Sequence, residues 1–334
     1  MPELDASAPQ QGDLADLLRA NGYQLGGESP NIEYISRLPR EIKARVSALK
    51  ANQLKGVEIE SEFYAKVHEL EKQFEAKFNK VFEERRKIVS GEYEPKPEEA
   101  TLPIFHGASE DEIKELNEKS EEYKGEKGIP NFWLQVFKTA ESVGDMIQEH
   151  DEPILKHLTD VTTTVDVSPP GFSIYFHFSE NPYFKNAVLK KTYILDPKYD
   201  PQEPFDYDGP SVEKCSGDKI DWLEGKDVTK KVVKKKQKKG ANAGKFLTKT
   251  VKADSFFNFF DPPQPKAEDE RNEDDEDEEE VELLQADFEL GQIIRDHVVP
   301  RAVLFFTGEA ADDDMFDDFA DEGDDDEDEE DEDE

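Results

Sequence analysis

The sequence predicts an α+β fold in which a very long helix precedes an antiparallel sheet with helices around it. Apolar residues recur every three or four positions between residues 37 and 89, which is the helical period. The segment FSIYFHF alternates with period two, which is typical of a strand. Because the strand patterns gather in mid-chain with helical patterns on either side, the sheet should be antiparallel. The 334 residues are enough for one or two domains with cores of their own.

The first long segment, Arg37 to Val89, has no proline after Pro39 and a single glycine, Gly56. A helix of about 50 residues would be about 75 to 80 Å long. Such a rod cannot bury its apolar stripe against one compact domain, so the pattern predicts antiparallel or parallel pairing with a second copy. The alternative is two ordinary helices separated near Gly56. The predicted dimerisation residues are Ile42, Val46, Leu49, Val57, Phe63, Val67, Leu70, Phe74, Phe78 and Val81.

The composition divides the chain into five parts. Glycine and proline do not continue a helix, so Gly91 and the segment EPKPEE should end the rod. A short charged helix is expected between Ser109 and Lys124. The predicted parts are a mobile N-terminal arm at 1–36, the dimerisation helix at 37–90, a linker with the accessory helix at 91–128, an α+β domain at 129–308 that includes a basic hairpin at 228–252 and an acidic insert at 266–282, and an acidic tail at 309–334.

The segment after Pro130, NFWLQVFKTAESVGDMIQEH, has the pattern of one amphipathic helix with Asn131 as its N-cap. Its apolar side should face the core of the domain. Its other side should form an acidic ridge. The apolar side contains Trp133, Phe137, Ala140, Val143 and Ile147, and the ridge contains Glu141, Asp145, Glu149 and Glu152.

Four strands and a hairpin are predicted beyond this helix. The first two are VTTTVDV and FSIYFHF, joined by a turn at Pro169-Pro170-Gly171. The third is expected around Tyr193 and the fourth around residues 220–222. The two runs that flank Gly240 to Gly244 predict a hairpin with a five-residue loop.

The net charge of −39 comes mainly from two short runs. Residues 268–282 contain 12 acids and one arginine, and residues 309–334 contain 19 acids and no base. Runs this polar should be disordered as isolated chain, because they cannot offset the entropy of ordering. A field of this sign repels nucleic acid, so direct DNA or RNA recognition is disfavoured and a basic partner is favoured.

Aromatic residues inside the last acidic run indicate more than a solubilising tail. In the segment DDDMFDDFADE they can serve as apolar anchors on a basic surface. The alternative is that the run only keeps the protein soluble. The tail residues predicted to bind a basic partner are Asp314, Phe316, Asp317, Asp318 and Phe319.

The predicted hairpin is the most basic part of the chain, with ten lysines and no acid between residues 230 and 252. Such a patch is typical of nuclear import signals or of attachment to a polyanion. The alternative is a solvated edge hairpin that its lysines protect from aggregation. The predicted import residues are Lys230, Lys231, Lys234, Lys235, Lys236, Lys238 and Lys239.

Signatures of catalysis and of metal binding are missing from the sequence. It contains no phosphate-binding loop, dinucleotide fingerprint, HExxH or GxSxG motif, and we predict a protein that is not an enzyme and has no cofactor and no metal. His150 and His157 lack convincing ligand spacing, and the Asp206–Gly209 fragment lacks the glutamate of a calcium loop. The lone Cys215 and the lack of a long apolar run favour a soluble intracellular protein without membrane contact.

Several segments, in order, resemble the nucleosome assembly protein family of histone chaperones. These are GIPNFWLQVF, PGFSIYFHFSENPYF, LKKTYIL, SFFNFFDPP, GQIIRDHVVPRAVLFFTGEA and the acidic tail, behind a long helix. The resemblance runs from about residue 38 to residue 308. It implies a homodimer joined by the long helices, an earmuff-like α+β domain in each subunit and an acidic underside for core histones. By position in the matched motifs, the residues implied to face histones are Asp145, Glu149, Asp151, Glu282 and Glu289.

The function implied is that of a histone chaperone that shields core histones from non-specific DNA contacts and deposits them during nucleosome assembly. The resemblance also implies an import receptor that recognises the lysine hairpin, and traffic between cytoplasm and nucleus. Sequence-specific nucleic-acid binding is not expected. The alternative function is an acidic calcium-buffering or general polycation-binding protein.

Overall fold

The computed structural model describes residues 31–120, 122, 124–236, 246–264 and 275–310. These residues belong to two compact units. One extends to Glu60 and includes Tyr199–Tyr207, and the other comprises Ser61–Lys198 and the chain from Asp208 onward. In the part of the chain that the structure describes, no helix has a stretch long and apolar enough to cross a membrane.

The predicted long helix is confirmed. After the short helix α2 (Ile32–Arg37), α3 (Arg40–Ser90) runs without interruption for 51 residues. The alternative of two helices separated near Gly56 is wrong, because one interior glycine costs only about 1 kcal/mol relative to alanine and the rest of α3 contains no helix breaker. In the first unit, the ammonium of Lys50 lies 5.4 Å from the centroid of the Phe205 ring.

The accessory helix is also present, although it is shorter than predicted. It is α4 (Glu110–Glu118), and its N-terminus is a capping box in which Ser109 and Glu112 bond to each other's backbone N–H groups. Ser109 was therefore correctly predicted as the start of the helix. The described residues between Lys119 and Lys124 are not helical.

The second unit contains a sheet of four antiparallel strands in the order β1 (Leu158–Val167), β2 (Pro170–Phe178), β3 (Val188–Asp196) and β4 (Ser211–Gly217). The α+β class is therefore confirmed, but the predicted position of the fourth strand is wrong. Trp222 makes only an isolated bridge with Phe184 among the described residues. The true fourth strand, SVEKCSG, is a mostly exposed edge strand, so it lacks the alternation by which we identified the others.

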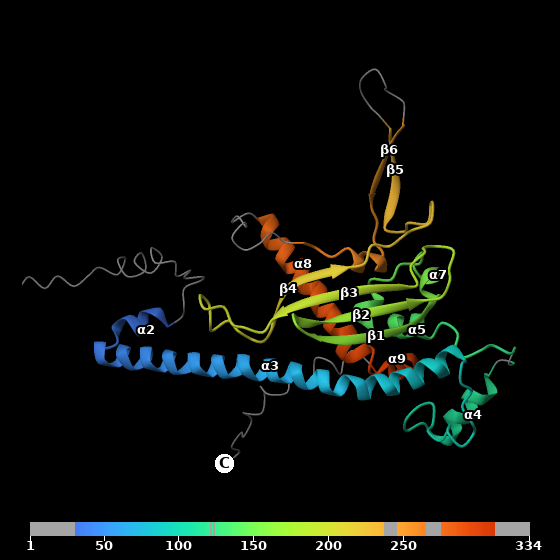
Figure 1. The fold of residues 1–334 in the computed structure, drawn as a ribbon, viewed down its shortest axis with the longest axis horizontal. Helices are drawn as coiled ribbons and strands as arrows, with labels where there is room; N and C mark the ends of the chain where they lie inside the picture. The colour runs from blue at the N-terminus through green and yellow to red at the C-terminus, as the bar shows by residue number, and fades with distance from the viewer. Residues whose placement is uncertain (1–30, 121, 123, 237–245, 265–274, 311–334) are drawn as a thin grey trace, which may run out of the picture. The chain divides into compact units, whose positions relative to one another are not determined.

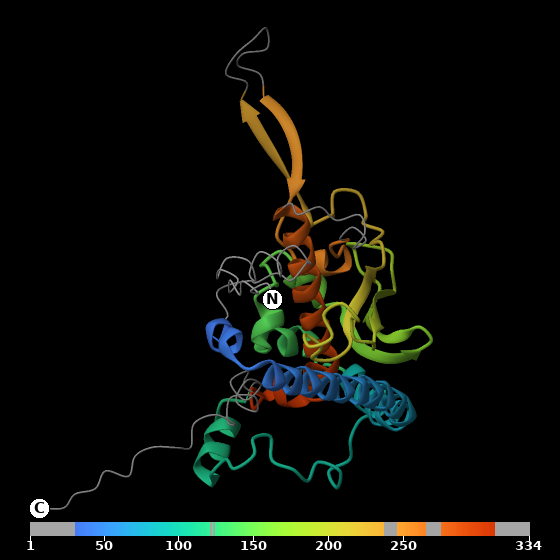
Figure 2. The ribbon, with the colours of Figure 1, turned by 90° about the vertical axis from the view of Figure 1, so that its left-hand side faces the viewer.

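Helices pack on one face of this sheet, as Figures 1 and 2 show. They include α5 (Phe132–Thr139), the 3-10 helix η1 (Phe256–Phe260), α8 (Asp275–Gln292), the π-helix η3 (Ile293–Val298) and α9 (Ala302–Thr307). Between them and the sheet lies an aromatic core. The Phe176 ring of β2 lies 5.2 to 6.2 Å, centroid to centroid, from the rings of Phe137, Phe256, Phe259 and Phe260.

A buried polar cluster fixes α8 against this sheet. The carboxylate of Asp287 on α8 accepts hydrogen bonds from Lys191 Nζ at 2.8 Å, from the Tyr193 hydroxyl at 2.9 Å and from Cys215 Sγ at 3.2 Å. Lys191 is completely buried. A Cβ atom on Gly291, one turn further along α8, would lie 2.5 Å from the Tyr193 ring, so only glycine permits this approach.

The acidic run at residues 268–282 is partly helical, so the prediction that it is disordered is wrong for residues 275–282. Asp275 to Glu282 form the first turns of α8, and residues 265–274 lie outside the described chain. The helix continues into residues that bury Leu284 and Phe288 in the core. The acidic turns at residues 275–282 therefore continue a helix that is already packed against the core, so no free energy is needed to nucleate a separate helix.

The predicted hairpin is present, with strands β5 (Lys230–Lys236) and β6 (Phe246–Lys252) paired antiparallel. It extends away from the sheet and its helices, as Figure 2 shows. The backbone N–H of Ala253 donates to Thr229 O at 2.8 Å at the base of the hairpin. The loop predicted at Gly240 to Gly244 lies outside the described residues.

Asp160 of β1 is a buried carboxyl group, only 4% exposed. Burial raises the pKa of Asp160 to about 6, because the attraction of Arg85 and the hydrogen bond from the Val161 N–H only partly offset desolvation. The charged form is thus penalised in the folded chain. Its contribution to stability is most favourable at low pH and is lost as the pH rises from about 4 through about 6.

We predict that Asp160→Asn is more stable than the parent protein at pH 8, because asparagine has no charge to bury. The advantage should be smaller by about 1 kcal/mol at pH 5.5, where the native carboxyl group is mostly protonated. Urea unfolding of both proteins at the two pH values measures this difference. A difference in unfolding free energy that does not change with pH would contradict the assignment.

Candidate functional site

The segment predicted as one helix from residue 131 to residue 150 is broken into short pieces. These are α5, then α6 (Glu141–Gly144), and after several turns α7 (Glu152–Leu155). Ala140 separates the first two, with an extended ψ of 103°. Asn131 adopts a left-handed φ of 58° and makes no side-chain cap, so its predicted N-cap role is wrong.

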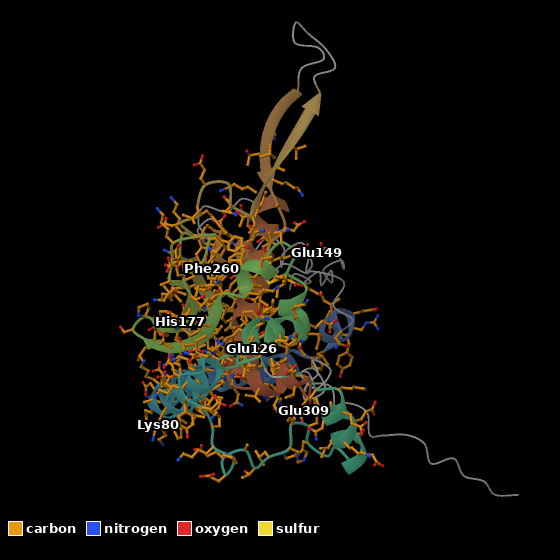
Figure 3. All side chains as sticks on the ribbon, turned by 90° about the vertical axis from the view of Figure 1, so that its right-hand side faces the viewer. Lys80, Glu126, Glu149, His177, Phe260 and Glu309 are labelled. Atoms are coloured by element: carbon orange, nitrogen blue, oxygen red, sulfur yellow. The ribbon has the colours of Figure 1, made fainter. Side chains whose placement is uncertain are left out.

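The acidic residues predicted on this segment have different surroundings. Asp145 and Glu149 are exposed, and Figure 3 labels Glu149 at the surface and Phe260 in the core. Glu152 accepts a hydrogen bond from Lys138 at 2.6 Å, which lowers the pKa of Glu152. Asp145 and Glu149 are therefore available to a basic partner, whereas Glu152 already has a cation of its own.

Asp151 is a correction to the predicted site, because its side chain is completely buried. Its carboxylate accepts hydrogen bonds from the Ser255 hydroxyl at 2.7 Å, the Phe256 N–H at 2.8 Å and the Gln148 N–H at 3.0 Å. Asp151 thus joins the acidic segment to η1 across more than 100 residues of sequence. It cannot face a partner, and it holds its exposed neighbour Glu149 in place.

Glu282 and Glu289 lie on α8 and both are exposed. They are seven residues apart, which is about two helical turns, so they share one side of the helix. Glu289 accepts a hydrogen bond from Gln285 Nε2 at 3.1 Å. Because Asp287 is held in the buried polar cluster, the orientation of α8 is fixed with these two carboxylates directed to solvent.

The tail residues Asp314, Phe316, Asp317, Asp318 and Phe319 lie outside the described chain, but the residue where the last acidic run begins is described. Glu309 accepts hydrogen bonds from the His106 N–H and the Thr307 hydroxyl, both at 2.6 Å. These bonds lower the pKa of Glu309. No sequence pattern indicated this contact, because residues 106 and 309 are far apart in the chain.

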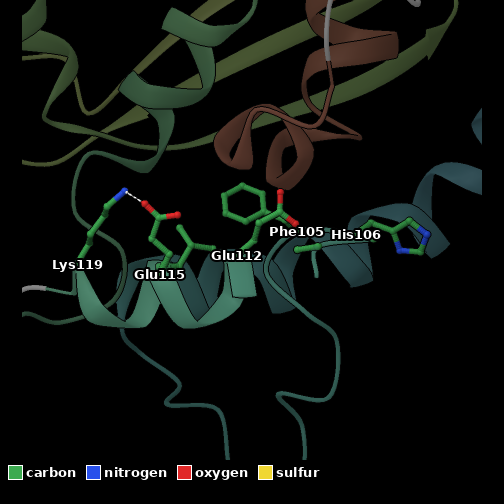
Figure 4. A pocket seen from close by; sticks show the side chains of 8 residues that line it. Phe105, His106, Glu112, Glu115 and Lys119 are labelled. Carbon is green, nitrogen blue, oxygen red and sulfur yellow. Dashed lines mark hydrogen bonds and ion pairs between the residues drawn. The ribbon is translucent and has the colours of Figure 1, made fainter. Parts of the chain in front are cut away.

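His106 also lines a groove of about 490 Å³ beside α4, shown in Figure 4. Phe105 and Leu116 supply apolar surface, and Lys119 donates to Glu115 at 2.6 Å at its edge. The first residue of the acidic tail run is thus held at the accessory segment.

The predicted dimerisation residues are mostly exposed. Leu49 is 68% exposed, Phe63 60%, Phe78 57% and Val81 60%, which is unusual for apolar residues of this size. Ile42, Val46 and Val67 are partly exposed. Val57 is the exception at 5%, so it is buried within its own subunit and does not belong to the exposed stripe. The remaining stripe residues are Leu70 and Phe74, which are 51% and 42% exposed.

The described lysines of the hairpin leave a positive surface. Lys230 donates to Asp227 at 2.7 Å, which raises the pKa of Lys230, and Lys231 is exposed. The backbone of Lys234, Lys235 and Lys236 is described in β5, and Lys238 and Lys239 lie outside the described residues.

Titratable groups that could form a metal site are dispersed. In the described ranges no three of the histidine, cysteine and acidic residues come together as metal ligands. His150 Nε2 is 3.1 Å from Asp254 O, and His157 Nδ1 is 3.3 Å from the Ser179 hydroxyl. Burial raises the pKa of Cys215 to about 12, so this thiol is a poor nucleophile.

The protein is an α+β protein with a long helix and a four-stranded antiparallel sheet that packs on an aromatic core. Two of its packed segments carry exposed acids. A family model described as Nucleosome assembly protein (NAP) matches residues 44–309. The chain belongs to the nucleosome assembly protein family, and the resemblance noted from its motifs is confirmed.

Two vertebrate relatives of known name agree with this assignment. The chain is 46% identical over 301 residues to Nucleosome assembly protein 1-like 1 of Xenopus tropicalis, which covers 87% of this chain and 75% of that protein. It is 46% identical over 294 residues to the Homo sapiens protein of the same name, covering 84% of this chain and 73% of that one. The solved structure of Nucleosome Assembly Protein 1 from Plasmodium knowlesi has a TM-score of 0.49 at 24% identity, covering 82% of this chain and 99% of the other.

We predict that Asp151→Ala lowers the free energy of unfolding by about 3 kcal/mol or more, because it leaves three donors without their acceptor in the core. The exposed neighbour provides the control, since Glu149→Ala should change stability by less than about 0.5 kcal/mol. Urea unfolding measures both. Equal midpoints for the two variants would show that Asp151 has no structural role.

Proposed function

We propose that the protein is a non-enzymatic histone chaperone that binds core histones through its acidic surfaces. The observation that carries this proposal is the placement of exposed carboxylates on packed segments. Asp145 and Glu149 stand beside the buried anchor Asp151, and Glu282 and Glu289 stand on the helix that Asp287 fixes. The names of the relatives, all nucleosome assembly proteins, support the same partner.

The mechanism needs no chemical step. Histones are strongly basic and bind DNA phosphate tightly with release of counterions, so direct mixing traps incorrect complexes. An acidic protein covers those basic surfaces and repels DNA, given its net charge of −39. It gives up the histones where the ordered nucleosome offers better contacts, because transfer follows a difference in binding free energy.

Two kinds of acid have different roles in this proposal. Carboxylates on packed segments form defined contacts with lysine and arginine, which slow dissociation. Carboxylates of the run from Glu309 to Glu334 supply long-range attraction, which speeds capture and is screened by salt over about 8 Å at physiological ionic strength. Phe316 and Phe319 add an apolar contribution that salt does not screen.

The active form in this proposal is a homodimer. The stripe on α3 leaves Phe63, Leu70, Phe74 and Val81 exposed, and a second copy of the same stripe would bury them. The dimer brings two sets of acidic surfaces to one histone complex.

We also propose that the lysine hairpin is the signal that an acidic import receptor recognises. The protein would then carry histones from the cytoplasm to the nucleus. Its strands project from the domain, which makes it accessible, and its charge is opposite to that of the proposed histone-binding surfaces (Figure 2). Opposite charge allows the receptor and the histones to bind at separate places.

We predict that reversing Asp145 and Glu149 to lysine raises the dissociation rate of core histones about tenfold or more at every salt concentration, because the defined contacts are lost. Deleting residues 312–334 should mainly reduce the association rate at low salt. Stopped-flow kinetics across a salt series separates the two effects.

A matched control reverses Glu94 and Glu98, two exposed linker acids with the same spacing. This variant has the same net charge as the Asp145 and Glu149 variant, so it should retain the native dissociation rate. Histone binding at native rates by the Asp145 and Glu149 variant would refute the proposed docking surface.

We predict further that changing Lys234, Lys235, Lys236, Lys238 and Lys239 to alanine impairs nuclear entry and leaves histone binding in vitro nearly intact. The physical reason is that these cations attract an acidic receptor and repel histones. Imaging of a fluorescent fusion measures entry, and a binding titration measures histone affinity. Normal nuclear accumulation would remove the import role from the hairpin.

A further inference from the structure

The accessory segment between α3 and α5 exposes several large apolar side chains. In its linker Leu102 is 87% exposed and Ile104 is 73% exposed, and on α4 the side chains of Ile113 and Leu116 are exposed as well. Ile113 and Leu116 are three residues apart, so they are neighbours on the surface of the helix. Exposed apolar side chains that gather in one segment are typical of a surface that a partner covers.

The groove beside α4 gives part of this surface a defined shape, and we call it the accessory groove. Its volume of about 490 Å³ lies within the range of about 300 to 1,000 Å³ that is typical of binding pockets. Phe105, Ala108 and Leu116 supply its apolar lining. Figure 4 shows the side chains of Glu112 and Glu115 on the same side of α4 as the Phe105 ring.

The charged lining of the accessory groove has a negative balance. Lys119 donates to Glu115 at 2.6 Å, so these two charges offset each other. Glu112 has no cation of this kind, and its carboxylate accepts hydrogen bonds from the Ser109 N–H at 2.8 Å and the Ser109 hydroxyl at 2.7 Å. The capping box therefore holds the Glu112 carboxylate in a fixed position, which reduces the entropy lost when a cation binds it.

The last acidic run begins at this groove. Glu309 is bonded to the backbone of His106, which lines the groove, and Ala310 is the last described residue. From Glu309 to Glu334 the sequence contains 19 acids and no base. A ligand in the accessory groove therefore has an apolar surface on one side and a strongly acidic chain that starts beside it.

We propose that the accessory groove binds a short basic segment of a histone partner that carries one aliphatic side chain. The aliphatic side chain packs against Phe105 and Leu116. Lysine or arginine residues next to it contact Glu112 and the acids that follow Glu309. This inference rests on the proposed function and adds to it a docking place outside the two packed acidic segments.

Charge selects this occupant over the others that the chain offers. The acidic run contains Met315 and Phe316, and six residues from Ala310 reach about 20 Å, but its acids would be repelled by Glu112. The proposed import receptor is acidic and is repelled in the same way. A second copy of the accessory segment brings five acids and two lysines between residues 109 and 119, which is again the same sign.

A pair of synthetic peptides tests the groove. Each has twelve residues of lysine, arginine and glycine with a fluorescent label, and the central residue is leucine in one and serine in the other. The full chain should bind the leucine peptide about fivefold more tightly, because the aliphatic side chain leaves water. Fluorescence anisotropy at an ionic strength of about 0.15 M measures both affinities, since long-range attraction is then largely screened. Equal affinities would overturn the proposal.

A variant of the apolar lining assigns this leucine preference to the groove. Leu116→Ser should reduce the preference to less than about twofold, whereas Leu116→Met should retain it. The matched control is Leu102→Ser, which makes the same change at an exposed leucine outside the groove and should retain the preference. A preference that is lost in Leu102→Ser and kept in Leu116→Ser would place the apolar contact in the linker and contradict the assignment.

The charged lining is tested by Glu112→Gln. Glutamine can also form a capping box, so α4 keeps its N-terminus while the groove loses a negative charge. Both peptides should bind about two- to threefold more weakly, with the leucine preference unchanged. Glu98→Gln, at an exposed linker acid, is the control and should bind both peptides as the parent does. Unchanged affinities in Glu112→Gln would remove the cation contact from the proposal.

Deletion of residues 312–334 distinguishes a histone segment from the chain's own acidic run as the occupant. If the groove is open to the partner, the shortened chain should bind both peptides more weakly and keep the same leucine preference. A leucine preference that rises on deletion would show that the acidic run itself covers the groove, and would overturn the proposal. Sedimentation of Leu116→Ser at the parent's mass excludes a second copy as the occupant, and a smaller mass would support it instead.

Core histone binding, measured in parallel, separates this inference from the proposed function. Leu116→Ser should release core histones about threefold faster than the parent, and Leu102→Ser should not. If the parent binds core histones but does not distinguish the two peptides, the groove inference is wrong and the chaperone proposal stands. If the parent binds no core histones, the proposed function is wrong as well.

Discussion

The fold depends on one largely buried carboxylate, that of Asp287, whose side chain is 12% exposed, and on the groups that bond to it. Lys191 is completely buried on β3, and an ammonium group in that position is tolerated only if a counter-charge lies in contact with it. Asp287 supplies that charge from α8 and also accepts from Tyr193 and Cys215. The cluster therefore spans two strands and a helix, and it leaves only one rotation of α8 about its axis.

The rotation of α8 connects this cluster to the outer surface. With Asp287 facing inward, Leu284 and Phe288 enter the core, and Glu282 and Glu289 face solvent. Asp151 has the same role for the other acidic segment, since its bonds to Ser255 and Phe256 fix the turn that carries Glu149. In both places one acid forms hydrogen bonds in the interior of the domain and thereby fixes the position of nearby acids at the surface. Fixed surface acids lose less conformational entropy when a partner binds.

The elements that the sequence predicted well are those with local periodicity. The 51-residue helix, the strands around Phe172 and Tyr193 and the lysine hairpin each repeat a pattern over many residues. The wrong predictions concern places where contacts between residues far apart in the sequence determine the local structure. The break at Ala140, the edge strand at Cys215 and the burial of Asp151 depend on partners up to 105 residues away. Asp145, Glu149 and Asp151 look alike in sequence, and only the packing of η1 distinguishes the structural acid from the exposed ones.

The position of Cys215 within the cluster has a consequence for the redox behaviour of the protein. Burial holds the thiol in its protonated form, and its S–H group is engaged with Asp287. Thiolate is the species that oxidants and alkylating agents attack, so the closed fold protects the only sulfhydryl group of the chain. Any reaction at this sulfur must wait for β4 or α8 to separate locally from the sheet. The rate at which a thiol reagent modifies Cys215 therefore measures how often this part of the domain opens locally.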